Sequence, residues 1–202
     1  MSKDDYSLKL VEKKHIKDLM ESYHYLSKEQ VTFKSGVNVG LLHKESIVGA
    51  CVFTGFPVPE LAKGCFGLER HEQDGLYELS RFVLEPSHQR REYNLASWFM
   101  ARSIRCLLSQ KQSVRAVLSY ADSRHHSGTI YRACNFDYYG LSDKKSDFWI
   151  RQSDGTFKKH SRGSVKGIDG EWRPRSRKHR FLKIHDKKLK CCLLYTSPSP
   201  RD

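Results

Sequence analysis

The residues of this chain with the clearest chemical potential lie in one stretch, Ser119–Gly140, where an apolar strand gives way to a helix. Asp122 directly follows the strand expected over 114–120, and the helix is expected from about Ser127 to Cys134. Ligands of open α/β sheets collect beyond the carboxyl ends of the strands, so the Asp122 carboxylate should face such a crevice and could take a proton there. The competing interpretation is that Asp122 caps the turn.

A second candidate carboxylate, Glu78, lies on the strand expected over 77–84. Alternation along a strand puts Glu78 and Ser80 on one face, with apolar neighbours beside them. A carboxylate that is partly buried in this way has a raised pKa, which suits it to accept a proton from a substrate. The competing interpretation is an ion pair between Glu78 and a basic neighbour such as Arg81 or Arg102.

A polar turn with two adjacent arginines, residues 85–96, leads into the long helix expected over 95–108. Backbone N–H groups at the start of a helix, the helix dipole and nearby arginines together form an anion site. The turn therefore predicts a site for a phosphate-bearing cofactor. Its candidate residues are Arg90, Arg91, Asn94, Ala96 and Ser97. The alternative is a plain helix N-terminus with Asn94 as its cap.

The apolar pattern also predicts the elements that must position these groups. Strands are expected at 6–11, 37–42, 47–53, 77–84, 114–120 and 148–150, and helices at 14–25, 95–108 and 127–134. Residues 56–75 are expected to form a loop, because prolines and glycines oppose regular structure there. The resulting order predicts an α/β (α+β) fold, in which helices flank a mixed central sheet on both sides.

Read as a motif, Y-A-D at 120–122 followed by G-x-I-Y-x-A-x-N-F at 128–136 resembles the closing half of a GNAT acyltransferase. More narrowly, it resembles the Mom family of bacteriophage adenine-modification proteins. The resemblance implies a GNAT-like fold in which Asp122, Tyr131 and Ser97 belong to the functional set and Tyr131 protonates a departing thiolate. A core aromatic is the other interpretation of Tyr131.

The same resemblance implies acetyl-CoA or a related acyl donor, and it admits iron as a further cofactor. GNAT proteins usually carry a glycine-containing pattern at the donor turn, whereas this chain has R-E-Y-N-L-A at 91–96. That departure is itself similar to the Mom family, and it leaves the identity of the donor open.

The positive charge of the chain is concentrated towards its end. Residues 1–150 hold 21 basic and 18 acidic residues, a net charge of +3, whereas residues 151–191 hold 14 and 4, a net charge of +10. Such a basic extension favours a polyanion through counterion release, with nucleic acid as the first candidate partner. Its cations alternate with aromatic residues that can stack on bases. The predicted nucleic-acid contacts are Arg124, His125, Trp172, Arg173, Arg175, Arg177, Lys178 and Arg180.

The extension could be a poorly ordered tail, but the run 178–183 resembles the closing strand of Mom-type proteins, which favours a docked element. The sequence predicts no metal site. Adjacent histidines such as His125 and His126 rarely bind one ion, and neither His24 nor His160 completes a convincing spacing. The six cysteines lack C-x-x-C spacing and are expected to be core thiols.

The segments at the two ends of the chain bear on its cellular context. No apolar run is long enough for a membrane span, and the first residues lack a signal peptide, so we expect a cytoplasmic, phage-encoded protein in a bacterial host. The last eleven residues, 192–202, match the translation of a sequencing adapter. We expect them to lie outside the natural protein and to lack fixed structure. The domains expected are therefore a GNAT-like domain over 1–150, the basic extension over 151–191, and this tail.

These observations predict an enzyme that modifies the exocyclic amine of adenine in double-stranded DNA by an acetamido or methylcarbamoyl-type addition, protecting phage DNA from restriction. The first alternative is a GNAT N-acetyltransferase acting on a small amine, a protein or tRNA. The second is a nucleic-acid-binding GNAT relic without catalysis. A homodimer is compatible with all three.

Overall fold

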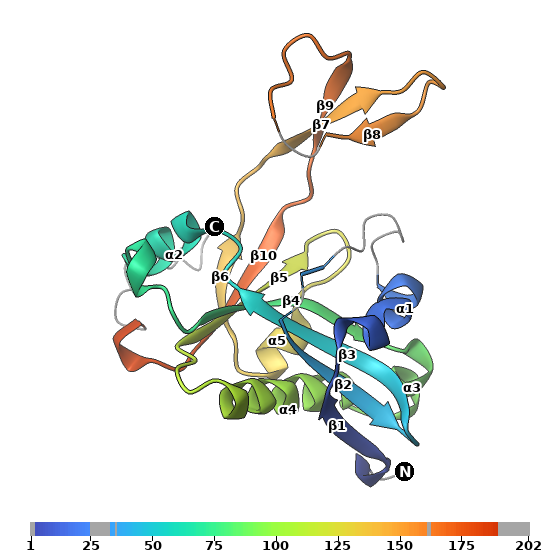
Figure 1. The fold of residues 1–202 in the computed structure, drawn as a ribbon, viewed down its shortest axis with the longest axis vertical. Coiled ribbons are helices and arrows are strands. Elements are labelled where there is room, and N and C mark those ends of the chain that lie inside the picture. The colour runs from blue at the N-terminus through green and yellow to red at the C-terminus, as the bar shows by residue number, and fades with distance from the viewer. Residues whose placement is uncertain (1–2, 25–32, 35, 161–162, 190–202) are drawn as a thin grey trace.

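The protein contains two sheets, described here from a computed structural model that covers residues 3–24, 33–34, 36–160 and 163–189 (Figure 1). In the seven-stranded main sheet, β4 and β5 pair in parallel and the other neighbours pair antiparallel. In spatial order its strands are β1 (Tyr6–Leu10), β2 (Val37–His43), β3 (Ser46–Gly55), β4 (Leu76–Leu84), β5 (Ala116–Asp122), β10 (Lys178–Ile184) and β6 (Asp137–Leu141).

Helices cover both faces of this sheet, which confirms the predicted fold class. They are α1 (Lys13–Tyr23), α2 (Pro59–Phe66), α3 (Pro86–Arg91), α4 (Leu95–Gln110) and α5 (Thr129–Ala133), with short 3-10 helices at Lys3–Asp5 and Arg70–Glu72. Phe99 of α4 shares a core with Cys51 of β3, whereas Ile16 of α1 packs with Ala50 of the same strand. Because successive strand residues point to opposite faces, α1 and α4 lie on opposite sides of the sheet.

The loop predicted over 56–75 is wrong at its start, where α2 forms. Pro59 occupies the first turn of α2, where a missing N–H costs nothing, and Gly67 ends the helix in the left-handed conformation with a φ of 69°. The residues that suggested a loop therefore delimit a helix. Phe66 of α2 packs against Leu118 of β5, so α2 covers the same face of the sheet as α1.

The strand predicted to close the main sheet at 148–150 is also misplaced. It forms part of β7 (Ser146–Arg151), the centre of a separate three-stranded sheet with β8 (Phe157–Lys159) and β9 (Gly170–Pro174). The main sheet instead receives β10, which lies between β5 and β6. Phe181 and Leu182 of β10 are 0% and 2% exposed and pack into the cores on the two faces. The basic extension thus supplies an interior strand.

The three-stranded sheet projects from the main sheet as an arm (Figure 1). Two antiparallel segments form its base, because Arg175 N–H donates to the Lys145 carbonyl (2.9 Å) and Ser142 N–H donates to the Lys178 carbonyl (2.8 Å). The Arg177 guanidinium also donates to the Ser142 carbonyl at 2.7 Å. The arm is therefore joined to the body through β6 on one side and β10 on the other.

The remaining expectations concern thiols and the ends of the chain. Cys51, Cys65, Cys106 and Cys134 are free, and Cys51 and Cys134 are buried. Among the described residues, no helix is long and apolar enough to cross a membrane. The expectation for residues 192–202 lies outside the described residues.

Candidate functional site

The site begins where β4 and β5 separate. The two strands pair from Leu76–Leu79 to Ala116–Ser119 and no farther, and the Ser119 hydroxyl donates to the Leu79 carbonyl (3.0 Å) at the last paired position. The pairing of β4 with β3 shifts register at Ser80, whose hydroxyl donates to the Val52 carbonyl (3.1 Å). This bulge turns the later part of β4 away from β5. A pocket opens between the diverging strands.

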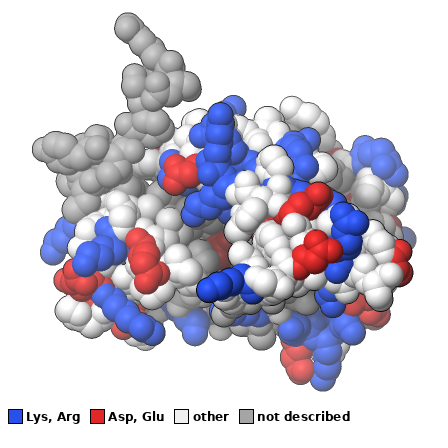
Figure 2. Space-filling model, turned by 90° about the horizontal axis from the view of Figure 1, so that it is seen from above, with Lys and Arg blue, Asp and Glu red and all other residues white. Residues whose placement is uncertain are grey.

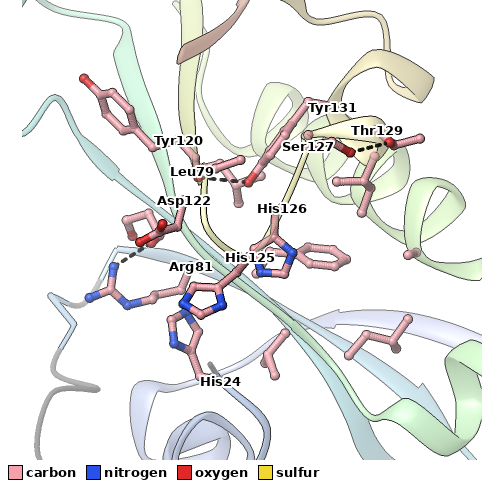
Figure 3. Close-up of a pocket in the computed structure, with 18 of the residues that line it drawn as sticks. His24, Leu79, Arg81, Tyr120, Asp122, His125, His126, Ser127, Thr129 and Tyr131 are labelled. Carbon is pink, nitrogen blue, oxygen red and sulfur yellow. Dashed lines mark hydrogen bonds between the residues drawn. The ribbon is translucent and has the colours of Figure 1, made fainter. Parts of the chain in front are cut away.

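The pocket has a volume of about 480 Å³ and combines residues that are distant in sequence. Its walls are the end of α1, the later half of β4, the end of β5, the loop over 123–128 and the start of α5 (Figure 3). Ser80, Ala96, Asp122, His125 and Tyr131 all line it, so the structure brings together five of the predicted site residues. Gln89 and Ala96 place the start of the donor turn and of α4 at the same pocket.

Asp122, at the end of β5, is 6% exposed and accepts hydrogen bonds from three directions. Ser176 Oγ donates at 2.7 Å, the Arg124 amide donates at 3.0 Å, and the Lys178 ammonium forms an ion pair with the carboxylate. Burial opposes ionisation, but these bonds outweigh it and hold the pKa of Asp122 well below its usual range. The carboxylate is therefore a fixed anion and a weak proton acceptor.

Asp122 also shapes the pocket through its backbone. Its carbonyl accepts the amides of His125 (3.0 Å) and His126 (2.8 Å) and thereby fixes the turn that follows β5. The same residue thus ties the pocket loop to Ser176 and Lys178 at the base of the arm. Asp122 therefore both caps the turn after β5 and lines the pocket, so the positions expected under the two interpretations are both found.

Tyr131 is 9% exposed, and its hydroxyl donates to the Tyr120 carbonyl at 3.4 Å. Its ring stacks on Phe181 of β10, with centroids 4.9 Å apart, and meets Phe136 edge-on. The ring is therefore packed as a core aromatic while its hydroxyl lines the pocket. The structure thus shows the core packing of the ring, and the role of the hydroxyl as a proton donor stays a prediction.

Glu78 is half-buried on β4 and lies outside the lining of the pocket. Burial raises the pKa of Glu78, and the positive charges of Arg81 and Lys34 only partly oppose this. Burial and the Glu78 charge raise the pKa of Tyr120, which does line the pocket, to about 12. Glu78 therefore lies near Tyr120, a residue that lines the pocket, and its pKa is raised above the usual value for a glutamate.

Three histidines and an arginine gather on the side of the pocket formed by α1 and the 123–128 loop. Figure 3 shows His24, Arg81 and His125 near one another, with His126 close by. Burial, Arg81 and His126 lower the pKa of His24 to about 4, so its imidazole is neutral at physiological pH. Burial and His125 lower the pKa of His126. Over the described part of the chain, no group of three or more His, Cys, Asp or Glu residues could hold a metal ion.

The donor turn differs from the predicted irregular turn because it contains α3. Arg90 and Arg91 are exposed there, whereas Glu92 is only 7% exposed. Asn94 is the N-cap residue of α4 with a φ of 57°, and its side chain makes no capping hydrogen bond. The Ser97 hydroxyl donates to the Asn94 carbonyl at 3.1 Å. The first turn of α4 is thus uncapped by Asn94 and close to two exposed cations, as an anion site requires.

Comparison with known proteins places this geometry in a family. A model of the Mom protein family matches residues 5–199. The chain belongs to the Mom protein family. The search of curated proteins found no match to this Mom-family chain.

Solved structures similar to this Mom-family chain include the ribosomal-protein-S18-alanine N-acetyltransferase of Escherichia coli, with a TM-score of 0.55 at 9% identity over 90% of this chain and 94% of that one. The IAA acetyltransferase of Bacillus cereus has a TM-score of 0.54 at 10% identity over 89% and 99%. A Bacillus subtilis acetyltransferase in complex with CoA has a TM-score of 0.52 at 12% identity over 89% and 97%. At these identities the likeness shows the GNAT fold.

The predicted nucleic-acid contacts of this Mom-family chain fall into three places. Arg124 and His125 lie in the loop beside the pocket, whereas Trp172, Arg173 and Arg175 lie on the arm or at its base. The others have structural partners or lie within the sheet. Arg177 bonds to the Ser142 carbonyl, Lys178 pairs with Asp122, and Arg180 lies opposite Tyr120 with a buried Nε that has no partner among the described residues.

Sequence reasoning missed several residues that build this Mom-family site. Ser119 and Ser176 carry no motif, and their roles depend on which strands become neighbours. His24 was weighed only as a metal ligand, although its place at the end of an amphipathic helix could have indicated a pocket residue. Arg81 was considered only as a partner of Glu78.

Proposed function

We propose that this Mom-family chain modifies the exocyclic amine of adenine in double-stranded DNA by an acetamido or methylcarbamoyl-type addition, and so protects phage DNA from restriction in the bacterial cytoplasm. The observation that carries this proposal is the Mom family match over 5–199. The pocket between β4 and β5 supports it, because Asp122 and Tyr131, two of the three residues that the family resemblance assigns to the functional set, line this pocket.

The chemistry requires an accessible base and an acceptor for its proton. Adenine in a duplex is stacked, so the enzyme must flip the base out at a cost of a few kcal/mol. The amine lone pair is delocalised into the ring, and a general base must remove a proton as the new bond forms. Of the two candidate carboxylates, Asp122 lines the pocket but has a lowered pKa, whereas Glu78 has a raised pKa but lies outside the lining. In this scheme the proton would reach Glu78 through Tyr120, the pocket residue whose pKa the Glu78 charge helps to raise.

In this scheme, the role of Asp122 is to hold neighbouring segments of the site in place. It holds the His125–His126 turn through its carbonyl and holds the base of the arm through its carboxylate. Its side chain is 6% exposed, and its negative charge is paired with the Lys178 ammonium. In this scheme Asp122 is required for activity although it accepts no proton from the substrate.

The donor would lie between the diverging strands, with its anionic end at the start of α4. Arg90, Arg91 and the N–H groups of Ala96 and Ser97 would bind that end, and the Tyr131 hydroxyl would supply a proton to the leaving group. An acyl-CoA type of donor is supported by the GNAT fold and by the similar structure that contains CoA. Simple acetyl transfer would give an N-acetyl amine, so the nitrogen of an acetamido group must come from a further donor, whose identity is open. The described residues do not form a site suited to iron, and no step is assigned to it.

The test is nucleoside mass spectrometry of plasmid DNA from cells that express the chain. We expect a heavier deoxyadenosine with the unaltered sequence and none with Asp122→Ala. Tyr131→Phe, which keeps the packed ring and removes only the hydroxyl, should reduce the modified fraction strongly. Unmodified DNA from cells that contain folded protein would contradict the proposal.

A second candidate function has a specific observation in its favour. The similar solved structures include acetyltransferases named for a protein substrate and for a small-molecule substrate. An N-acetyltransferase of that kind would transfer a group to a protein, tRNA or small amine in vitro and leave plasmid DNA unchanged. Activity in both assays would favour the DNA substrate only if the DNA reaction is faster at equal donor concentration.

A further inference from the structure

The arm has two faces of different character. Its centre is β7, and alternation puts Trp149 and Arg151 on one face and Phe148 and Ile150 on the other. Cross-strand pairing extends both faces over β8 and β9, because directly opposed residues point to the same side. Lys159 is opposite Trp149, and Lys158 is opposite Ile150. Two adjacent lysines of β8 therefore lie on opposite faces of one thin sheet.

The cations of the face that contains Lys159, and those at its edges, form ion pairs with acidic residues within the arm. These pairs are Lys159 with Asp147 (2.7 Å), Arg173 with Glu171, Arg151 with Asp169 (3.6 Å) and Arg175 with Asp147 (4.0 Å). The Arg173 guanidinium also lies over the rings of Phe157 (4.2 Å) and Trp149 (5.1 Å). A polyanion would have to break these contacts before it could use the cations of this face.

The opposite face presents an exposed aromatic ring and a lysine without an ion pair. Trp172 is 61% exposed, and Phe148, only 8% exposed, supports it edge-on with centroids 5.3 Å apart. Lys158 is exposed and forms no ion pair among the residues the structure describes. Gly170, opposite Ile150, has no room for a side chain, since a Cβ there would lie 2.2 Å from the Trp149 carbonyl oxygen. The missing side chain thus lets the Phe148 ring and the Trp149 carbonyl lie against the backbone of β9 beside Trp172.

The charge of the whole arm matches a polyanion. Residues 144–177 hold ten basic and four acidic residues, a net charge of +6. Seen from above, basic side chains alternate with acidic ones and with uncharged surface (Figure 2). Strand pairing places Lys158 on the Trp172 side, and Lys144 and Lys145 are exposed at the base of the arm.

We propose that the arm binds duplex DNA outside the target base through the face formed by Phe148, Ile150, Lys158, Gly170 and Trp172, while the Lys159 face points away from the DNA. Lys158 neutralises a backbone phosphate, and Trp172 packs its ring against the DNA surface. This inference rests on the proposed function only in its choice of duplex DNA as the substrate. It keeps Trp172 from the run at 172–180 and assigns the phosphate contact to Lys158 in place of the cations of that run.

The adjacent lysines supply a matched experiment. Lys158→Ala and Lys159→Ala remove the same charge from neighbouring positions, so they alter long-range attraction equally. Binding of each full-length variant to a fluorescein-labelled 20-base-pair duplex is measured by fluorescence anisotropy over a series of salt concentrations. We expect Lys158→Ala to weaken binding about fivefold and to reduce the slope of log K against log salt by about 0.9, the value for one phosphate contact. Lys159→Ala should stay within about twofold of the unaltered chain.

Trp172→Ala is the second variant and should weaken binding about tenfold, with little effect on the salt slope because its contact is uncharged. Circular dichroism and thermal unfolding of each variant establish that the arm variants keep their fold. Equal effects of Lys158→Ala and Lys159→Ala would overturn the assignment of the face. A Trp172→Ala variant that binds DNA normally but changes the sedimentation coefficient would also overturn it, since the ring would then contact a second copy of the chain.

The same measurement separates this inference from the proposed function. If the chain modifies adenine but both lysine variants bind the duplex equally, the arm inference fails and the proposed function stands. If plasmid DNA is unmodified but Lys158→Ala selectively weakens duplex binding, the arm inference stands and the proposed function fails. A chain that binds no duplex at all contradicts the arm inference directly.

Discussion

The pocket and the arm contain the same kind of ion pair, and the two pairs differ in their exposure to solvent. Each contains a carboxylate held by a lysine, Asp122 with Lys178 in the pocket and Asp147 with Lys159 in the arm. The Asp122 side chain is 6% exposed, whereas that of Asp147 is 20% exposed and its lysine is 46% exposed. Contacts removed from water fix the geometry of a site, and contacts left in water mainly balance charge.

The glycines show the same contrast. Gly128 in the pocket loop and Gly155 in the β7–β8 turn have nearly equal φ angles, 76° and 79°. A Cβ on Gly128 would lie 2.1 Å from the Phe181 ring, whereas nothing lies within 4 Å of one on Gly155. The pocket therefore constrains both backbone and space, and the arm turn constrains only the backbone. The following predictions test whether this difference extends to stability and activity.

The largest effect is expected for Gly128→Ala. A left-handed alanine costs about 1–2 kcal/mol, and forcing the Phe181 ring aside costs about 1–3 kcal/mol more. Because Phe181 stacks on Tyr131, DNA modification should also be lost. Gly155→Ala, the control, should cost only about 1–2 kcal/mol and leave modification intact. Urea unfolding and nucleoside mass spectrometry measure the two effects, and equal losses for both variants would contradict the comparison.

A slightly smaller loss of stability is expected for Asp122→Ala, which leaves Lys178 without its partner in a partly buried site. Removing one member of such a pair costs about 3 kcal/mol, whereas Asp147→Ala on the arm should cost less than about 1 kcal/mol. The first variant should lose modification, and the second should retain most of it. Asp122→Asn, which keeps the shape of the side chain, should be inactive as well if the charge is what holds the base of the arm.

The pH dependence of stability supplies an independent check on Asp122. Its pKa is lowered on folding, so its contribution is present above the pKa of the unfolded carboxyl, about 3.9, and is lost as the pH falls through the folded value. The difference in unfolding free energy between the unaltered chain and Asp122→Asn should therefore be constant from pH 7 to about pH 5. It should decrease below about pH 4. A difference that instead grows on acidification would show that the carboxylate is not held as an anion.

Glu78→Gln should separate activity from stability. As a general base, Glu78 would contribute about 10²–10⁴-fold to the rate, and its raised pKa would place the acid limb of the pH–rate profile above the usual range for glutamate. Burial disfavours the charged form, so a neutral glutamine at pH 7 should leave stability unchanged or slightly increased. Rates measured between pH 4 and 8 test this. An unchanged acid limb in Glu78→Gln would assign proton transfer to another group.

The sequence predicts the pocket better than it predicts the arm, for a physical reason. Local apolar patterns predicted β4 and β5, the position after β5 indicated Asp122 as a candidate, and the family resemblance indicated Tyr131. The bulge at Ser80 and the bond from Ser119 to Leu79 depend on strand pairing, which no single segment encodes. The pairing of β10 with β6 likewise could not be predicted from the sequence. The start of β10 lies 37 positions after the end of β6, and that separation gives no information about whether the two strands pair.

The arm was missed because its segments carry weak local signals. Residues 148–150 are apolar like a core strand, yet their partners are short strands with mostly exposed side chains. The run at 172–180 reads as one basic segment, but it divides between β9, a connecting segment and β10. The composition shows that positive charge is concentrated in the basic extension. It does not show which of these charges are paired, and the pairing of Arg173 with Glu171 and of Lys178 with Asp122 is seen only in the structure.

The smallest expected effect is the coupling between Lys159 and Asp147, measured by a double-mutant cycle of alanine variants in urea unfolding. Exposed pairs of this kind contribute less than about 1 kcal/mol, and 1 M NaCl, with a screening length of about 3 Å, should remove most of it. The matching cycle for Lys178 and Asp122 should give a larger coupling that survives salt, because that pair is shielded from solvent. If the arm pair proves as strong and as salt-resistant, the Lys159 face is held as rigidly as the pocket, and exposure does not explain the difference between the two regions.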